Sequence, residues 1–148
     1  MTPVQWRDAD ADDYELLVPW NLHLQEDEGS EPMPLAEIEA RMRRWLAADY
    51  RVVVFLSAGQ RVGYALFRPT DPDLKGPNGV YLRQFFIARE CRGEGLGHAA
   101  WTLLHTEVFP TGHKVVLEAL RSNPGARRFW ESLGFEAYST TYELRPPG

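Results

Sequence analysis

The chain has 148 residues, of which 44% are hydrophobic and 25% are charged, as expected for one globular domain with a buried core. Its formal net charge of −5 disfavours nucleic acid as a partner, because phosphate binding requires a basic surface. The longest apolar run, VVVFL, is too short to span a bilayer, and no signal-peptide pattern opens the sequence. The single cysteine, Cys91, cannot form an internal disulfide. We therefore expect a cytoplasmic protein without a membrane partner.

The first half of the chain combines strand and helix patterns. Aspartates followed by apolar residues at helical spacing predict a helix, which Pro19 should kink or divide. Pro34 can open a second helix, and two β-branched runs around the turn AGQ predict a hairpin. The predicted elements of this half are a strand over 3–7, helices over 8–29 and 35–48, and strands over 50–57 and 61–68.

The second half continues the mixed pattern after a turn-rich loop over 69–79. Its predicted elements are a strand over 80–88, a helix from 96 onward, a strand over 113–120, a helix between Asn123 and Gly134, and two short strands within 135–145. This order predicts an α/β or α+β fold in a single domain over 1–148. We expect a central mixed, mostly antiparallel sheet of about seven strands flanked by about four helices.

The stretch RECRGEGLGHAAWTLL (89–104) places Gly93, Gly95 and Gly97 between a strand and a helix. Glycine lets an anion approach the free N–H groups of a first helical turn, and Arg92 can add a charged contact. The pattern therefore favours a pyrophosphate ligand, and the alternative is that the glycines serve close packing only. The stretch contains no Walker G-x-x-x-x-G-K-[ST] sequence, and its G-x-G-x-G spacing differs from the dinucleotide fingerprint.

Two ordered stretches resemble the GCN5-related N-acetyltransferases, the GNAT superfamily. FFIARECRGEGLGHAAWTLL resembles their acetyl-CoA-binding motif, [RQ]-x-x-G-x-[GA], through Arg92, Gly95 and Gly97. LEALRSNPGARRFWESLGF resembles their next motif, a strand followed by an asparagine-capped helix that ends in LGF. The resemblance covers residues 80–136 and implies the GNAT fold, with acetyl-CoA as cosubstrate and no metal.

The resemblance also implies a binding role for particular residues. In this family the fourth strand bulges and separates from the fifth, which leaves a gap for the pantetheine arm of the coenzyme. Asn123 matches an asparagine that contacts this arm, although a plain helix cap explains it equally well. The residues expected to contact the coenzyme are Phe85, Phe86, Ile87, Arg92, Gly93, Gly95, Leu96, Gly97, Asn123 and Trp130.

Glu118 is the candidate catalytic base. It lies in the otherwise apolar run VVLEAL, where burial would raise its pKa toward a useful range, and it precedes Asn123 by the spacing seen in relatives that acetylate ribosomal-protein N-termini. The alternative is an ordinary carboxylate at the edge of a cleft. Trp130 stands where many family members carry a tyrosine as general acid, and it has no titratable proton.

The resemblance therefore implies an acetyl-CoA-dependent N-acetyltransferase that acts on a primary amine of a small molecule or peptide by direct attack. The rival hypothesis is a catalytically inactive acyl-CoA-binding or sensor protein of the same fold. The acidic segment QEDEGSEP could attract a cationic amine, but it could equally be a solvated turn. A homodimer formed through the C-terminal strands is a further expectation.

Overall fold

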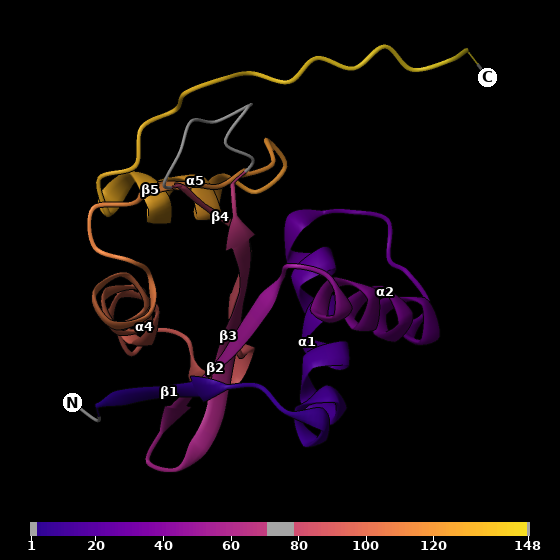
Figure 1. Cartoon of the computed structure of the whole chain (residues 1–148). Coiled ribbons are helices and arrows are strands. Elements are labelled where there is room, and N and C mark those ends of the chain that lie inside the picture. Colours follow the sequence, from indigo (N-terminus) through magenta and orange to yellow (C-terminus); the bar gives the residue numbers. More distant parts are fainter. Residues whose placement is uncertain (1–2, 71–78, 148) are drawn as a thin grey trace.

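The computed structural model describes residues 3–70 and 79–147, and most of the predicted loop over 69–79 lies outside the described residues. A five-stranded sheet in the order β1-β2-β3-β4-β5 forms its centre (Figure 1). The first four strands pair antiparallel and β5 pairs parallel to β4, so the sheet is mixed. The strands are β1 (Val4–Asp8), β2 (Arg51–Ser57), β3 (Gln60–Pro69), β4 (Gly79–Ile87) and β5 (Lys114–Val116).

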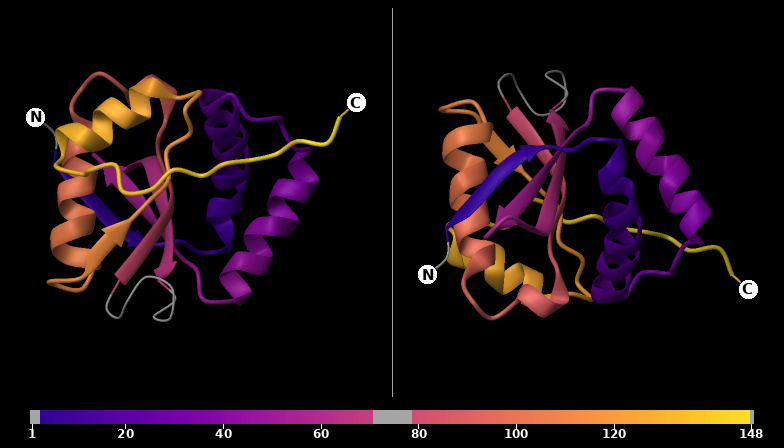
Figure 2. Two further views of the ribbon diagram at one scale, coloured as in Figure 1. Left: turned by 90° about the horizontal axis from the view of Figure 1, so that it is seen from above. Right: turned by 90° about the horizontal axis from the view of Figure 1, so that it is seen from below.

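Helices cover both faces of the sheet (Figure 2). On one face α1 (Tyr14–Glu28) and α2 (Leu35–Ala47) pack around the fully buried side chains of Ile38 and Tyr64. On the other face α4 (Leu96–Leu103) and α5 (Pro124–Ser132) enclose an aromatic core that contains Trp101 and Trp130. Three short helical turns complete the described elements, Ala11–Asp13, Arg89–Cys91 and Leu104–Val108.

Pro19 does not divide the helix, because α1 continues through this proline. The missing N–H of Pro19 removes only one bond, near the start of the helix, and both flanking segments are held by packing on the sheet. The helical segment begins with the short turn Ala11–Asp13, which runs directly into α1 at Tyr14. Asp10 and Asp13 form a capping box at this turn, in which each side chain accepts a bond from the backbone of the other end.

The sheet has five strands and not about seven, although the predicted fold class is correct. The predicted strand over 113–120 is reduced to Lys114–Val116, and no strand forms within 135–147. The C-terminal segment runs exposed and away from the helices in Figure 1, with Tyr142 90% and Leu144 99% exposed. Its alternating sequence suits a strand, but a strand forms only against a partner edge, and no pairing among the described residues includes this segment.

Candidate active site

A cleft of about 570 Å³ opens between β4 and the segment that follows β5. The two strands pair only from Gly79–Lys114 to Tyr81–Val116. Beyond that point β4 still pairs with β3 on one edge, but on its other edge residues 82–87 face the cleft instead of β5. A bulge at Arg83 accompanies this separation, because Leu66 pairs with Gln84 while Phe67 pairs with Leu82. The remaining walls are the start of α4, residues 117–120, one side of α5 and the last turn of α1.

The glycine turn forms one end of the cleft, and its glycines have two different roles. Gly93 and Gly95 adopt left-handed conformations, with φ of 85° and 78°, which other residues adopt at a cost. Gly97 has an ordinary conformation, but a Cβ there would lie 3.3 Å from the ring of Phe129 on α5. Gly95 is the N-cap residue of α4 and has no side chain to accept a bond from the first N–H groups of the helix. These groups, including the N–H of Leu96, can therefore bind an anion.

Arg92 lies in the cleft wall, but its guanidinium is already engaged. The side chain donates to the carbonyl oxygen of Ile87 at 2.8 Å and to the Asp27 carboxylate at 2.7 Å, and it stacks over Phe86. Arg92 therefore ties the glycine turn to the end of α1. A direct contact of its charge with a pyrophosphate stays a prediction.

The three β4 residues predicted to lie along the coenzyme arm point to alternate faces of the sheet. Phe86 is buried against α1, whereas Phe85 and Ile87 pack in the core on the α4 and α5 side. Phe85 stacks on Phe129 with 5.9 Å between ring centroids. All three residues line the cleft, so the backbone of β4 is accessible there.

Asn123 and Trp130 also line the cleft, from α5. The Asn123 side-chain oxygen accepts a bond from the N–H of Ala126 at 3.1 Å, which is a helix cap. Trp130 is 9% exposed and meets Phe85 edge to face at 5.3 Å, so it forms part of the floor of the cleft. A contact of either side chain with a coenzyme stays a prediction.

Glu118 lines the cleft, but the expectation of a buried strand residue is wrong. Because β5 ends at Val116, Glu118 lies beyond the strand and its side chain is exposed. It accepts a 2.7 Å hydrogen bond from the hydroxyl of Tyr81 on β4. Burial, followed by the bond to Glu118, raises the pKa of Tyr81 to about 12, so its hydroxyl keeps the donated proton at neutral pH.

The sequence matches the model of the acetyltransferase (GNAT) family over residues 6–135. The chain belongs to this family. It is accordingly an acyltransferase, from a family whose members transfer acetyl groups from acetyl-CoA to amine acceptors. No curated protein matched the sequence.

Solved structures share the GNAT fold at low sequence identity. A possible acetyltransferase from Clostridium difficile 630 superposes with a TM-score of 0.77 at 16% identity, covering 99% of each chain. A ribosomal-protein-alanine N-acetyltransferase from Brucella melitensis biovar Abortus 2308 gives 0.74 at 17% identity, over 97% of this chain and 99% of that one. A predicted acetyltransferase from Clostridium acetobutylicum, solved with acetyl-CoA, gives 0.70 at 22% identity over 96% of each chain.

A polar network that the sequence did not single out lies behind the cleft, and of its members Gln84 lines the cleft. Gln84 accepts bonds from Asn21 at 2.8 Å and from Tyr64 at 2.9 Å, so it belongs to a polar network between α1 and β4. Arg41 of α2 donates to Asn21 at 3.0 Å and extends the network. Asn21 is a polar residue between apolar neighbours, but Gln84 follows Arg83 and Arg41 lies in a charged stretch, so no sequence signal grouped them. Their grouping depends on tertiary packing.

The acidic residues at the end of α1 have different contacts. Glu26 and Asp27 pair with Arg89 at 3.0 and 3.2 Å, and these ion pairs hold the glycine turn. Glu28 lines the cleft, and burial raises the pKa of its carboxyl group. Among the described residues, the cleft is therefore lined by three carboxylates, Asp27, Glu28 and Glu118, of which Asp27 is paired with Arg89 and Arg92.

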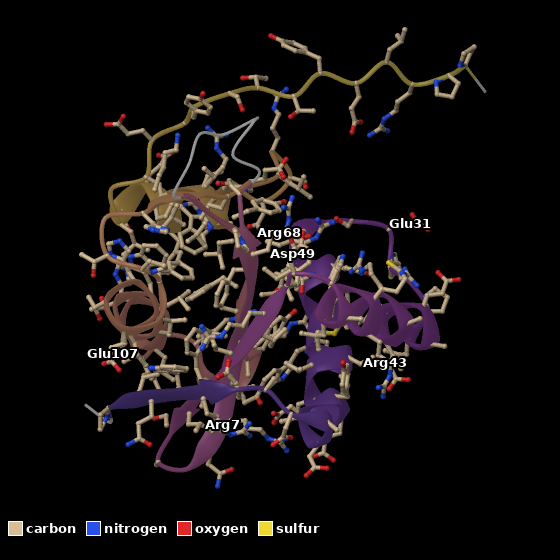
Figure 3. All side chains as sticks on the ribbon, viewed as in Figure 1. Arg7, Glu31, Arg43, Asp49, Arg68 and Glu107 are labelled. Atoms are coloured by element: carbon tan, nitrogen blue, oxygen red, sulfur yellow. The ribbon has the colours of Figure 1, made fainter. Side chains whose placement is uncertain are left out.

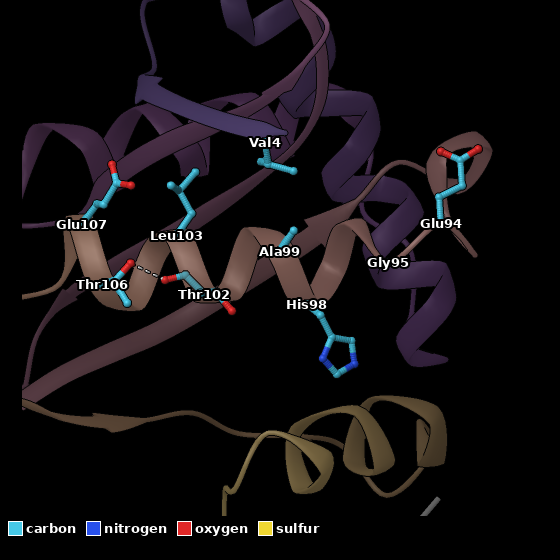
Figure 4. Close-up of a pocket in the computed structure, with 9 residues that line it drawn as sticks. All are labelled: Val4, Glu94, Gly95, His98, Ala99, Thr102, Leu103, Thr106 and Glu107. Atoms are coloured by element: carbon cyan, nitrogen blue, oxygen red, sulfur yellow. Dashed lines mark hydrogen bonds between the residues drawn. The ribbon is translucent and has the colours of Figure 1, made fainter. Parts of the chain in front are cut away.

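Other features of the GNAT chain lie outside this chemistry. Figure 4 shows a second, open groove between β1 and α4, lined by side chains such as Val4, Thr102 and Leu103. Burial raises the pKa of the Cys91 thiol, which is the opposite of what a nucleophile requires. Among the described residues, no group of three or more His, Cys, Asp or Glu could hold a metal ion. No helix in residues 3–70 and 79–147 is long and apolar enough to cross a membrane.

Proposed function

We propose that this GNAT protein transfers the acetyl group of acetyl-CoA to a primary amine of a small molecule or peptide, as a single domain over residues 1–148. The observation that carries the proposal is the early end of the β4–β5 pairing at Tyr81–Val116, with the uncapped N-terminus of α4 at one end of the resulting cleft. An extended coenzyme arm requires such an open strand edge, and a pyrophosphate requires such a helix terminus.

Residues of this chain fit the coenzyme at two places. The free N–H groups at Leu96 and Gly97 would hold the pyrophosphate, and Gly93 and Gly95 leave open space where a Cβ would stand. The backbone of residues 82–87 would pair with the amides of the pantetheine arm. Bound acetyl-CoA supplies the activated thioester. A backbone N–H of Phe85, Phe86 or Ile87 would polarise its carbonyl oxygen.

Glu118 is the proposed base that removes the proton of the attacking amine. The hydroxyl of Tyr81 fixes one carboxylate oxygen of Glu118 at 2.7 Å, which leaves the other oxygen for the amine or for one bridging water. Because Trp130 has no titratable proton, the departing thiolate takes its proton from water in the open cleft.

The alternative is an acyl-CoA-binding protein of the same fold without transferase activity. Trp130 favours it, since this residue occupies a wall of the cleft without offering a proton. Both functions use the same coenzyme site, which is the open edge of β4 and the N-terminus of α4. They differ only in whether the protein transfers the acetyl group.

Calorimetric titration with acetyl-CoA, free CoA and ADP tests the proposal. Micromolar binding of both CoA forms with much weaker ADP binding supports use of the β4 edge, because only the CoA forms carry the pantetheine arm. Equal affinity for ADP, or no binding of any of the three, contradicts the proposal. A panel of primary amines with detection of the released thiol then separates the transferase from the acyl-CoA-binding alternative.

A further inference from the structure

Two arginines lie together near the acceptor end of the cleft, one in its wall and one behind it. Arg41 of α2 and Arg83 at the bulge of β4 both place their guanidinium groups over the ring of Trp45, at 4.5 and 4.6 Å from its centroid. Arg83 also lines the cleft and donates to the Tyr50 hydroxyl at 3.1 Å. Two positive charges therefore share one aromatic surface, in a chain whose net charge is −5.

Neither guanidinium forms an ion pair with any residue that the structure describes. Nearby arginines do form such pairs, since Arg68 lies 4.0 Å from Asp49 and Arg92 lies 2.7 Å from Asp27. The difference leaves Arg83 in the cleft wall and Arg41 behind it without a direct carboxylate contact among the described residues, and Glu28 is the nearby negative group that acts on Arg41. Figure 3 shows that Arg68 and Asp49 lie together near the end of α2.

The guanidinium of Arg41 has few hydrogen-bond partners among the described residues. Its Nε atom is buried without a hydrogen-bond partner among the described residues, and its guanidinium donates one bond, to the Asn21 side chain. Burial and the adjacent charge of Arg83 both lower the pKa of Arg41. An anion beside the two guanidiniums would offset the repulsion between them and would bind in the bidentate geometry that arginine favours.

Arg83, at the bulge of β4, lies close to the proposed base Glu118. Tyr81 and Arg83 are two residues apart on β4, a spacing that corresponds to about 7 Å along a strand. Tyr81 holds Glu118, so one compact molecule can place an amino group at Glu118 and an anionic group at Arg83. The geometry points to a small amine acceptor that carries a carboxylate, with Arg83 and Arg41 as its specificity-determining residues. This inference rests on the proposed function.

The test compares each amino acid with its α-carboxamide as acceptor, for example alanine with alaninamide and phenylalanine with phenylalaninamide, and includes spermidine as a cationic amine. Thiol release gives the rate, and mass spectrometry identifies the acetylated product. We expect the acids to have KM values at least ten-fold below those of their carboxamides, because charge-assisted bonds to guanidinium are stronger than neutral ones. Equal KM values within the pairs, or a preference for spermidine, overturn the inference.

Arg83→Gln and Arg41→Gln should remove the preference by raising the KM of the acids at least ten-fold, with kcat and the affinity for CoA little changed. Arg83→Gln carries the main test, since its exposed side chain can change without loss of the fold. Arg43→Gln is the matched control on α2, because Arg43 pairs with Glu39 and stacks on Tyr14, away from the cleft. Equal effects of Arg83→Gln on acids and carboxamides contradict the inference.

Binding without turnover separates this inference from the proposed function. The CoA-loaded protein is titrated with the same acids and carboxamides in a calorimeter. Binding of acids that Arg83→Gln weakens supports the anion site even if no amine is acetylated. Absence of any difference between acids and carboxamides overturns it even if acetyl transfer is detected. Failure of CoA itself to bind contradicts only the proposed function.

Discussion

The two halves of the cleft are built in different ways. The coenzyme half uses backbone groups, namely the open edge of β4 and the free N–H groups of α4, together with glycines from one short stretch. The acceptor half uses side chains of β4 and of the segment after β5, such as Arg83 and Glu118, with Asn21 of α1 and Arg41 of α2 behind them. A site built from backbone groups tolerates most substitutions, except where a new side chain would fill the space that the ligand needs. A site built from side chains changes its ligand preference when one of them is substituted.

The largest expected effect is loss of the coenzyme half through Gly97→Glu. The new side chain would press on Phe129 and place a negative charge at the start of α4, where a pyrophosphate is proposed to bind. Calorimetry should detect no CoA binding. Thr102→Glu adds the same charge to the outer side of the same helix (Figure 4), and it should bind CoA normally. Wild-type affinity in Gly97→Glu would remove the assignment of the glycine turn.

Glu118→Gln should affect turnover and leave the coenzyme half intact. Loss of a positioned base lowers rates by about a hundred-fold or more, so kcat should fall by at least that factor while the affinity for CoA stays within two-fold. Steady-state kinetics with an identified acceptor and calorimetry measure the two quantities. Glu131→Gln, on the exposed side of α5, is the matched control. Unchanged kcat in Glu118→Gln would exclude Glu118 as the base.

Tyr81→Phe should have a smaller effect, because it removes the hydrogen bond that positions Glu118 and keeps the carboxylate. We expect kcat to fall about ten-fold with little change in KM. Since the pKa of Tyr81 is raised to about 12, the wild-type rate should not decline as pH rises through the ordinary tyrosine range near 10. A decline there that Tyr81→Phe abolishes would show that this hydroxyl titrates earlier than its surroundings imply.

Much of the coenzyme half could be predicted from sequence because its signals are local. Gly93, Gly95 and Gly97 lie within five residues, and Asn123 and Gly134 mark the two ends of α5. Such features follow from backbone conformation, which neighbouring residues determine. The same local rules failed for the C-terminal strands, since pairing of 135–145 requires a partner edge that no local pattern specifies.

The acceptor half could not be predicted in the same way. The grouping of Arg41, Arg83 and Trp45 depends on how α2 crosses the sheet and on the bulge in β4, and neither is a local property of the sequence. Glu118 lines the cleft, but its predicted burial in a strand was wrong, because the length of β5 is set by its separation from β4.

Asp13→Asn should have the smallest effect on the cleft and should act on stability instead. Asp13 is 1% exposed and accepts bonds from Arg7 at 2.7 and 2.9 Å and from Arg61 at 3.1 Å, which tie α1 to β1 and β3. These bonds, above all those from Arg7, lower its pKa from 3.8 to about 2. Its stabilising contribution, about 2 kcal/mol, is therefore present above pH 4 and is lost as the pH falls from 4 toward 2.

Urea unfolding at pH 7 should show Asp13→Asn to be about 2 kcal/mol less stable than the wild type, with CoA affinity unchanged. Between pH 4 and pH 2 the variant should lose less stability than the wild type, because it lacks the group that titrates there. Asp12→Asn, in the same turn but exposed, should match the wild type in both measurements. An acid transition of equal size in Asp13→Asn would mean that other carboxylates carry the pH dependence.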